Sequence, residues 1–289
     1  MIRLLVAAFI PFVVMAQVAD SKPTSRGTHV DGAAVSAVND PAAQALFAKA
    51  SATQIKGESA FEVRDFQADL EATIYEKDKD TGEQAARSAH LTQFFRFNAT
   101  SRPSYRSDRF EPLTKKQVTK GFDGNSHWMK LGREPARELI GREDQEDRRS
   151  TTNEVNRTTD MLSCLVLRNL MVEGATYHTL GSLVLTPGGK SVRAQGILLR
   201  RPKGGLIEIW VVGDDASLVA LRRSSDEGSK ELLVMSQHRP LVVGSHTISM
   251  PYVIESFDGD RLILEARASS TTAIKVNSGI EDAVFSLPR

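Results

Sequence analysis

Cysteine is almost absent from this chain of 289 residues: Cys164 is the only one, so no disulfide can form within the chain. A lone thiol in an exported protein can be reactive or can pair with another chain. Cys164, however, lies in the strongly apolar stretch from Met161 to Leu167. A cysteine in such a stretch commonly acts as a small buried hydrophobe, so we expect a buried thiol.

Net charge is also small, at +1 from 37 basic and 36 acidic side chains. Proteins that bind nucleic acid usually present a basic face or have a pI above about 9. The charge balance therefore gives no electrostatic basis for a nucleic-acid partner.

Signatures of catalysis are missing too. No H-E-x-x-H motif and no G-x-S-x-G motif occur, so neither a zinc protease site nor an α/β-hydrolase nucleophile is predicted. The segment 186–191 ends in Gly-Gly-Lys-Ser, but Val184 stands where a phosphate-binding loop needs its first glycine, so we interpret it as a turn. No histidine has another four residues away: they are His29, His90, His127, His178, His238 and His246. We expect no enzyme activity, no metal and no cofactor.

The one long apolar run lies at the start of the chain. Arg3 precedes an apolar segment from Leu4 to Val14, and Val14-Met15-Ala16 fits a signal-peptidase site, which together predict a secretory signal peptide over residues 1–16. A membrane anchor is the alternative, but a span needs about 20 apolar residues. We therefore predict export to the periplasm, with a flexible leader over 17–39 and one domain over 40–289.

Apolar and polar residues alternate along most of the remaining chain, which predicts strands. A helix is expected from Pro41, capped by Asp40, and a second from Met161 to Val172, with Thr159-Asp160 as its cap. The charged segment 133–149 predicts a solvated loop or an exposed helix. Turn signals every 8–12 residues favour an antiparallel sandwich or barrel of roughly eleven strands. The strands are expected at 66–74, 91–97, 104–110, 117–122, from 128, 192–199, 206–212, 218–223, 230–237, 251–256, 261–267 and 271–276.

Four motifs occur in an order that resembles the outer-membrane lipoprotein carrier family (LolA and LolB). The ending at 274–288 reads I-x-V-N-x-G-I-x-D-x-x-F-x-x-P. Earlier come Arg102-Pro103 with an aromatic residue and a second arginine, an Asp-Gly hairpin at 122–128, and Arg-Pro-Leu-Val-Val-Gly at 239–244. The resemblance covers about residues 40–288. It implies a mainly β fold with α: a curved antiparallel sheet that forms an unclosed half-barrel, with helices as a lid.

The resemblance also implies a function: a periplasmic carrier that holds the acyl chains of lipoproteins, or another lipid, in an apolar cavity. Large residues on alternating strands are the candidates for its lining: Phe95, Phe97, Trp128, Leu206 and Trp210. Each could instead fill an ordinary core. In the family, an arginine at the Arg-Pro step holds the lid, and Arg102 occupies that position. An envelope protein could act as donor or acceptor. The alternative is a regulatory or scaffold module of the same fold that binds a protein partner in the cell envelope.

Overall fold

The computed structural model describes residues 39–57, 61–77, 84–98, 102–170, 173–202, 205–224 and 231–288. The predicted signal peptide and nearly all of the predicted leader lie outside these ranges. Neither helix among the described residues combines the length and apolar character that crossing a bilayer requires.

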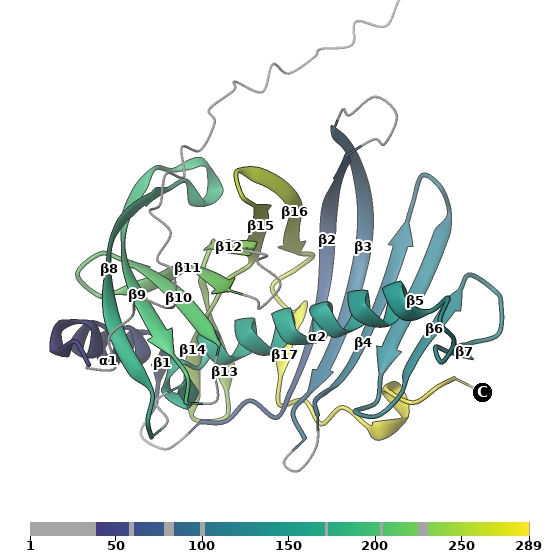
Figure 1. The fold of residues 1–289 in the computed structure, drawn as a ribbon, viewed down its shortest axis with the longest axis horizontal. Helices are drawn as coiled ribbons and strands as arrows, with labels where there is room; N and C mark the ends of the chain where they lie inside the picture. Colours follow the sequence, from purple (N-terminus) through teal and green to yellow (C-terminus); the bar gives the residue numbers. More distant parts are fainter. Residues whose placement is uncertain are drawn as a thin grey trace, which may run out of the picture.

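A curved antiparallel sheet of fourteen strands forms most of the molecule (Figure 1). Its order is β7-β6-β5-β4-β3-β2-β16-β15-β12-β11-β10-β9-β8, and the short β17 also pairs with β2. Because β7 and β8 end this order without pairing to each other, the sheet stays unclosed. The predicted class, a mainly β half-barrel with helices, is confirmed.

The strands of the sheet fall into two runs along the chain. The first run comprises β2 Asp65–Lys77, β3 Gln84–Arg96, β4 Ser104–Glu111, β5 Lys116–Phe122, β6 His127–Leu131 and β7 Arg137–Glu138. The second comprises β8 Thr176–Leu185, β9 Val192–Arg200, β10 Leu206–Val212, β11 Ser217–Ser224, β12 Glu231–Ser236, β15 Val253–Asp258, β16 Arg261–Ala268 and β17 Ile274–Val276. A separate small sheet joins β1 Ile55–Lys56 to the hairpin of β13 Arg239–Val243 and β14 His246–Met250. The structure therefore has more strands than the sequence predicts.

The first helix and the C-terminal turn form as the local sequence predicts. Helix α1, Pro41–Gln54, begins where expected, and the Asp40 carboxylate accepts a hydrogen bond of 2.9 Å from the backbone N–H of Ala42. At the other end β17 leads into a turn in which Asn277 and Gly279 adopt positive φ. The Asn277 side chain ties this turn to the entry of β2 by donating to the Glu62 carbonyl at 2.8 Å. Phe285 then packs inward, with 1% of its surface exposed.

The second helix differs from the prediction. Helix α2 spans Gln145–Leu165 and is followed by the short 3-10 helix η2, Leu167–Leu170, so the expected start at Thr159-Asp160 is wrong. Asp160 is no cap: it is buried within the helix and lies 3.5 Å from the guanidinium of Arg201. The charged segment 133–149 accordingly contains β7, a turn and the first residues of α2. The sequence left a loop and an exposed helix open for this charged stretch, because the stripe of α2 that faces the sheet over 145–157 is polar.

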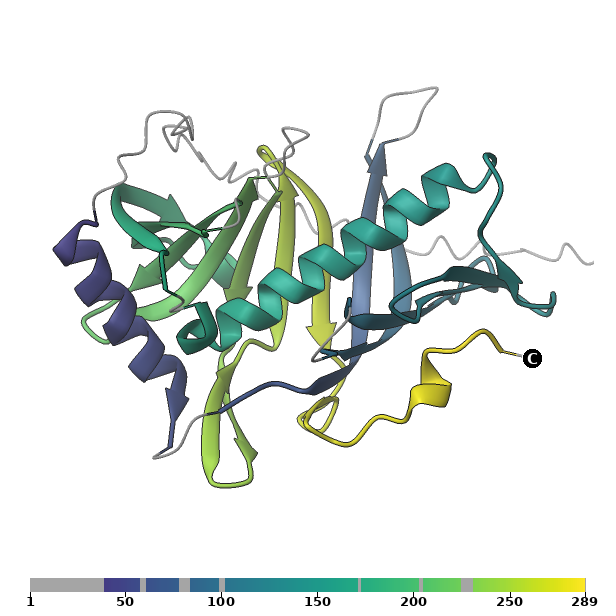
Figure 2. The same cartoon turned by 60° about the horizontal axis from the view of Figure 1, so that its bottom comes forward.

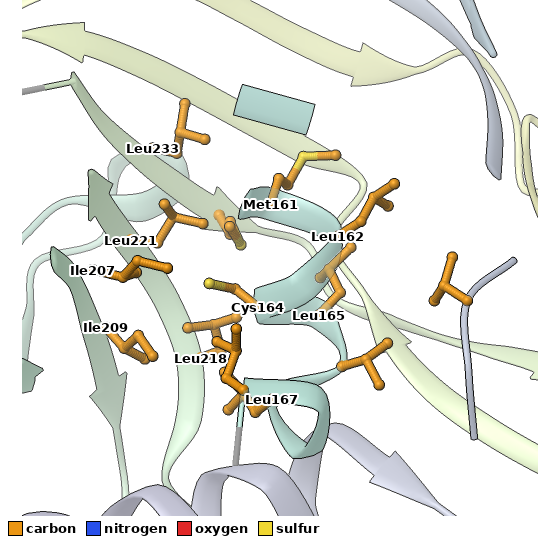
Figure 3. Packing of buried hydrophobic residues seen from close by; sticks show 14 of the residues in the cluster. Met161, Leu162, Cys164, Leu165, Leu167, Ile207, Ile209, Leu218, Leu221 and Leu233 are labelled. Atoms are coloured by element: carbon orange, nitrogen blue, oxygen red, sulfur yellow. The ribbon is translucent and has the colours of Figure 1, made fainter. Parts of the chain in front are cut away.

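Helix α2 lies across one face of the sheet, with β5 near one of its ends and both β11 and the β14 strand of the small sheet near the other (Figures 1 and 2). The main apolar cluster fills the space beneath its C-terminal half, where the helix meets Ile207, Ile209 and Leu221 (Figure 3). Cys164 points into this cluster and is fully buried. A second cluster, around Trp210, lies on the other face of the strands from β8 to β12.

The burial of Cys164 predicts that its thiol reacts slowly with reagents in solution. Burial raises the pKa of the thiol far above its usual value, with a smaller contribution from the Asp160 carboxylate. Because the thiolate is the reactive form, a polar thiol reagent should label the native protein slowly and the urea-unfolded protein quickly. Rapid labelling of native protein, followed by mass spectrometry, would contradict the packing of α2.

Candidate functional site

The space between α2 and the sheet is the candidate site. Residues of α2 spaced three and four apart share one face of a helix, and those that line this space follow that spacing. In chain order they are Gln145, Glu146, Arg149, Ser150, Asn153, Glu154, Arg157, Thr158, Met161 and Leu165. The lining is therefore polar along the first two thirds of the helix and apolar only at its end.

A cleft of about 880 Å³ lies under the polar part of α2. Its opposite wall comes from β2, β3, β4 and β16 and includes Gln93, Tyr105, Ser107 and Arg109. The loop before α2 adds Arg142 and Glu143 at the rim. The cleft is thus open, and positive, negative and uncharged polar groups line it together with the aliphatic side chains of Ile74, Leu91, Ile263 and Leu264.

An apolar pocket of about 70 Å³ adjoins the cleft under the end of α2. Phe66, Ala68, Leu233, Met250 and Ile254 are among the sheet residues around it, and Met161 and Leu165 cover it from the helix. The cleft and the pocket share five lining residues: Leu91, Gln93, Arg157, Thr158 and Leu264. The two spaces therefore form one site that is polar at one end and apolar at the other.

Polar contacts hold α2 to the sheet along this site. The Arg157 Nε–H donates to the Glu231 carboxylate at 2.9 Å, and the Lys120 ammonium lies 3.1 Å from the Ser150 hydroxyl. The Tyr105 hydroxyl donates to the Glu154 carboxylate at 3.0 Å. Burial, reinforced by Glu154, raises the pKa of Tyr105 well above its usual value, so this phenol stays protonated and keeps donating. The N-terminal two thirds of α2 are thus joined to the sheet by polar contacts, and its end by apolar packing.

Of the predicted cavity residues, Phe95 and Phe97 lie on the α2 side of the sheet. Phe95 is fully buried in the main apolar cluster, and its ring meets that of Phe97 edge-on at 4.8 Å. Both pack into or against this cluster and are absent from the linings of the cleft and the apolar pocket. Contact between these rings and a ligand stays a prediction.

The other three predicted residues lie on the opposite face. Successive side chains of a strand point to opposite faces: His127 contacts Thr152 of α2 at 3.1 Å, so Trp128 points away from the helix. Its indole donates a hydrogen bond of 2.8 Å to the Phe285 carbonyl of the C-terminal segment. Leu206 and Trp210 belong to the second apolar cluster. The structure therefore does not bring the five aromatic and aliphatic candidates together.

Arg102 lies just before β4 with an exposed side chain, and its carbonyl accepts a hydrogen bond of 2.7 Å from the Asn98 amide. Its charge acts on His127: burial first, then Arg148 and Arg102, lower the pKa of this histidine. Arg102 is thus near a residue that contacts α2. Its role as a latch of the lid stays a prediction.

The polar half of the site was missed by the sequence analysis. The signal that could have found it is the spacing of Glu146, Ser150, Asn153 and Arg157, which repeats at helical intervals over residues 146–157. Among the residues that the structure describes, no group of three or more histidine, cysteine, aspartate or glutamate side chains could hold a metal ion.

The sequence matches no protein-family model and no curated protein sequence. Solved structures do match. A LolA superfamily protein from Nitrosomonas europaea is 11% identical, with a TM-score of 0.42 over 84% of this chain and 97% of that one. A domain described as an outer membrane lipoprotein-sorting protein, from Vibrio parahaemolyticus, is 10% identical, with a TM-score of 0.41 over 84% and 94%.

A DUF1329 family protein from Desulfovibrio piger is 12% identical, with a TM-score of 0.45 over 86% of this chain and 98% of that one. The matches thus include the superfamily that the sequence motifs resemble. With TM-scores below 0.5, the function of this chain has to follow from its own geometry.

Proposed function

We propose that this protein is a carrier that binds a lipid under helix α2, with an acyl chain in the apolar pocket. The observation that carries the proposal is the apolar pocket beneath Met161 and Leu165, which continues into an open cleft. A pocket of this kind on an unclosed sheet offers apolar surface to a chain and a route of entry. In line with the resemblance of its motifs, we propose acyl chains of lipoproteins or another lipid as cargo and no enzymatic activity.

The pocket is too small for a chain while α2 is in place. Its volume of about 70 Å³ is roughly half of an engineered cavity of about 150 Å³ that holds benzene. Binding therefore requires α2 to lift. The polar contacts of Arg157, Ser150 and Glu154 would break, and the helix would tilt about its C-terminal end, so that the pocket widens from the side of Arg157 and Thr158.

The expected binding free energies suit a carrier that must also release its cargo. A fully buried chain of sixteen carbons would contribute about 12 kcal/mol, at about 0.8 kcal/mol for each methylene. Lifting α2 loses several hydrogen bonds of roughly 0.5–1.5 kcal/mol each, which offsets part of this gain. In this proposal Arg102 borders the lid, and Phe95 and Phe97 support the pocket from within the core.

The direct test uses the wild-type protein. Native mass spectrometry of protein purified from an envelope fraction should show bound lipid, and a fluorescent fatty acid should bind to the delipidated protein and be displaced by unlabelled fatty acid. If neither lipid nor apolar dye binds, the alternative gains support: a regulatory or scaffold module of the same fold that meets a protein partner.

The proposed location is the periplasm, after removal of residues 1–16. The mature protein should then begin near Gln17, because the small residues before it fit the peptidase site. N-terminal sequencing of protein from the envelope fraction checks this expectation. A product that retains Met1 and stays embedded in the membrane would contradict it.

A further inference from the structure

The face that α2 presents to the cleft is polar, which favours a polar ligand group there. A helix that covers an apolar cavity normally presents an apolar stripe to it. Here all eight α2 residues that line the cleft, from Gln145 to Thr158, are polar. Placing a hydrocarbon chain against them would desolvate these groups without giving them partners, which is unfavourable. Contact between the N-terminal part of α2 and a polar group is therefore more favourable than contact with an acyl chain.

The charges around the cleft have both signs. Arg142 and Arg149 lie at its outer part together with Glu143 and Glu146, and all four side chains are exposed. Deeper in the cleft, Glu154 and Arg157 pair with Tyr105 and Glu231 of the sheet. A ligand group that enters the outer part thus meets guanidinium groups and carboxylates side by side.

The wall opposite α2 adds one more donor. Arg109 lines the cleft, and its Nη2 pairs with the Glu111 carboxylate at 2.6 Å. Its Nε is buried and has no hydrogen-bond acceptor within the described part of the chain. Arg109 therefore adds a positive group on the side of the cleft opposite α2.

We propose that the cargo is a zwitterionic amphiphile, with its headgroup in the cleft and its acyl chain in the apolar pocket; this rests on the proposed function. The ammonium of the headgroup lies near Glu143 and Glu146, and its phosphate lies near Arg142 and Arg149. Arg157, which lines both spaces, marks the level at which headgroup gives way to chain. A purely anionic headgroup would face the same carboxylates without a cation to pair with them.

The test compares two lipids that differ only in the headgroup. Lysophosphatidylethanolamine and lysophosphatidylglycerol with the same acyl chain are titrated against a bound fluorescent fatty acid, below their micelle-forming concentrations. Low ionic strength is used because exposed charges are least screened there. We expect the zwitterionic lipid to bind about fivefold to tenfold more tightly, as two exposed charge pairs would provide.

Paired variants locate the effect. The double variant Glu143→Gln/Glu146→Gln should reduce the preference to within about twofold, since the partners of the ammonium are removed. Glu134→Gln/Glu138→Gln changes the net charge equally at exposed residues that do not line the cleft, and should leave the preference as it is. An unchanged preference in the first variant would overturn the assignment of these carboxylates.

Other outcomes separate the two proposals. If both lysolipids bind equally, or the anionic one binds more tightly, the headgroup inference is overturned while lipid binding stands. If neither lysolipid binds and the fatty acid does not bind either, the proposed carrier function fails, and the inference fails with it.

Discussion

Replacement of Trp128 by alanine is expected to lower the free energy of unfolding by about 3–5 kcal/mol, the usual range for a buried tryptophan. Only 1% of its surface is exposed, and its ring lies across Gly121 of the neighbouring strand. A Cβ on Gly121 would come within 2.1 Å of this ring. The loss combines a large cavity with a broken hydrogen bond to the Phe285 carbonyl. Urea unfolding followed by circular dichroism measures it.

One further variant shows how much of the loss in Trp128→Ala comes from the ring and how much from its hydrogen bond, and a second serves as an exposed control. Trp128→Phe keeps most of the ring but removes the donor to Phe285, so it should cost less than Trp128→Ala. Leu113→Ala at a site that is 87% exposed should change stability by no more than about 0.5 kcal/mol. Because Trp128 points away from α2, the folded fraction of Trp128→Ala should bind a fatty acid as the wild type does. Weaker binding there would instead support the sequence-based prediction that Trp128 lines the cavity.

Replacement of Leu264 by tryptophan is expected to weaken acyl-chain binding at least about tenfold. Leu264 is partly buried at the boundary between the cleft and the pocket. An indole ring in place of its side chain would fill the entrance to the pocket. Excluding two methylenes from the pocket, at about 0.8 kcal/mol each, already corresponds to more than a tenfold loss of affinity. Titration with a fluorescent fatty acid measures the change.

The substitution adds apolar surface rather than charge, so the protein should remain folded, as circular dichroism can verify. The matched control, Leu113→Trp, introduces the same side chain at an exposed turn and should leave affinity unchanged. Wild-type affinity in Leu264→Trp would show that the chain does not enter beside this residue, and the proposed site would have to be abandoned.

Features that depend on neighbouring residues could be predicted from the sequence. The Asp40-Pro41 pair sets the start of α1 because both the cap and the proline act within one helical turn. The alternation from Phe66 to Ile74 sets β2, since only a strand repeats with a period of two. The turn at Asn277 and Gly279 forms because these residues tolerate positive φ.

Helix α2 shows where local information was insufficient. Residues 145–157 carry almost no apolar stripe, so their sequence alone does not distinguish a solvated loop from a helix. They form a helix because its inward polar groups find partners on distant strands, such as Glu231 for Arg157 and Tyr105 for Glu154. Those partners are 74 and 49 residues away along the chain.

The sequence by itself therefore determined a mainly β fold with a helix before the strands and another among them, because periodicity and turn residues act locally; that the sheet stays open was implied only by the resemblance of its motifs. It could also place Phe95, Trp128 and Trp210 on strands. Alternation shows that neighbouring side chains point to opposite faces, but it does not say which face a helix will cover. Only the tertiary structure decided which face α2 covers. Phe95 lies on the covered face, whereas Trp128 and Trp210 lie on the other face, each across a glycine of the adjacent strand. The tertiary structure also placed a polar cleft beside an apolar pocket, because that juxtaposition depends on how α2 crosses the curved sheet.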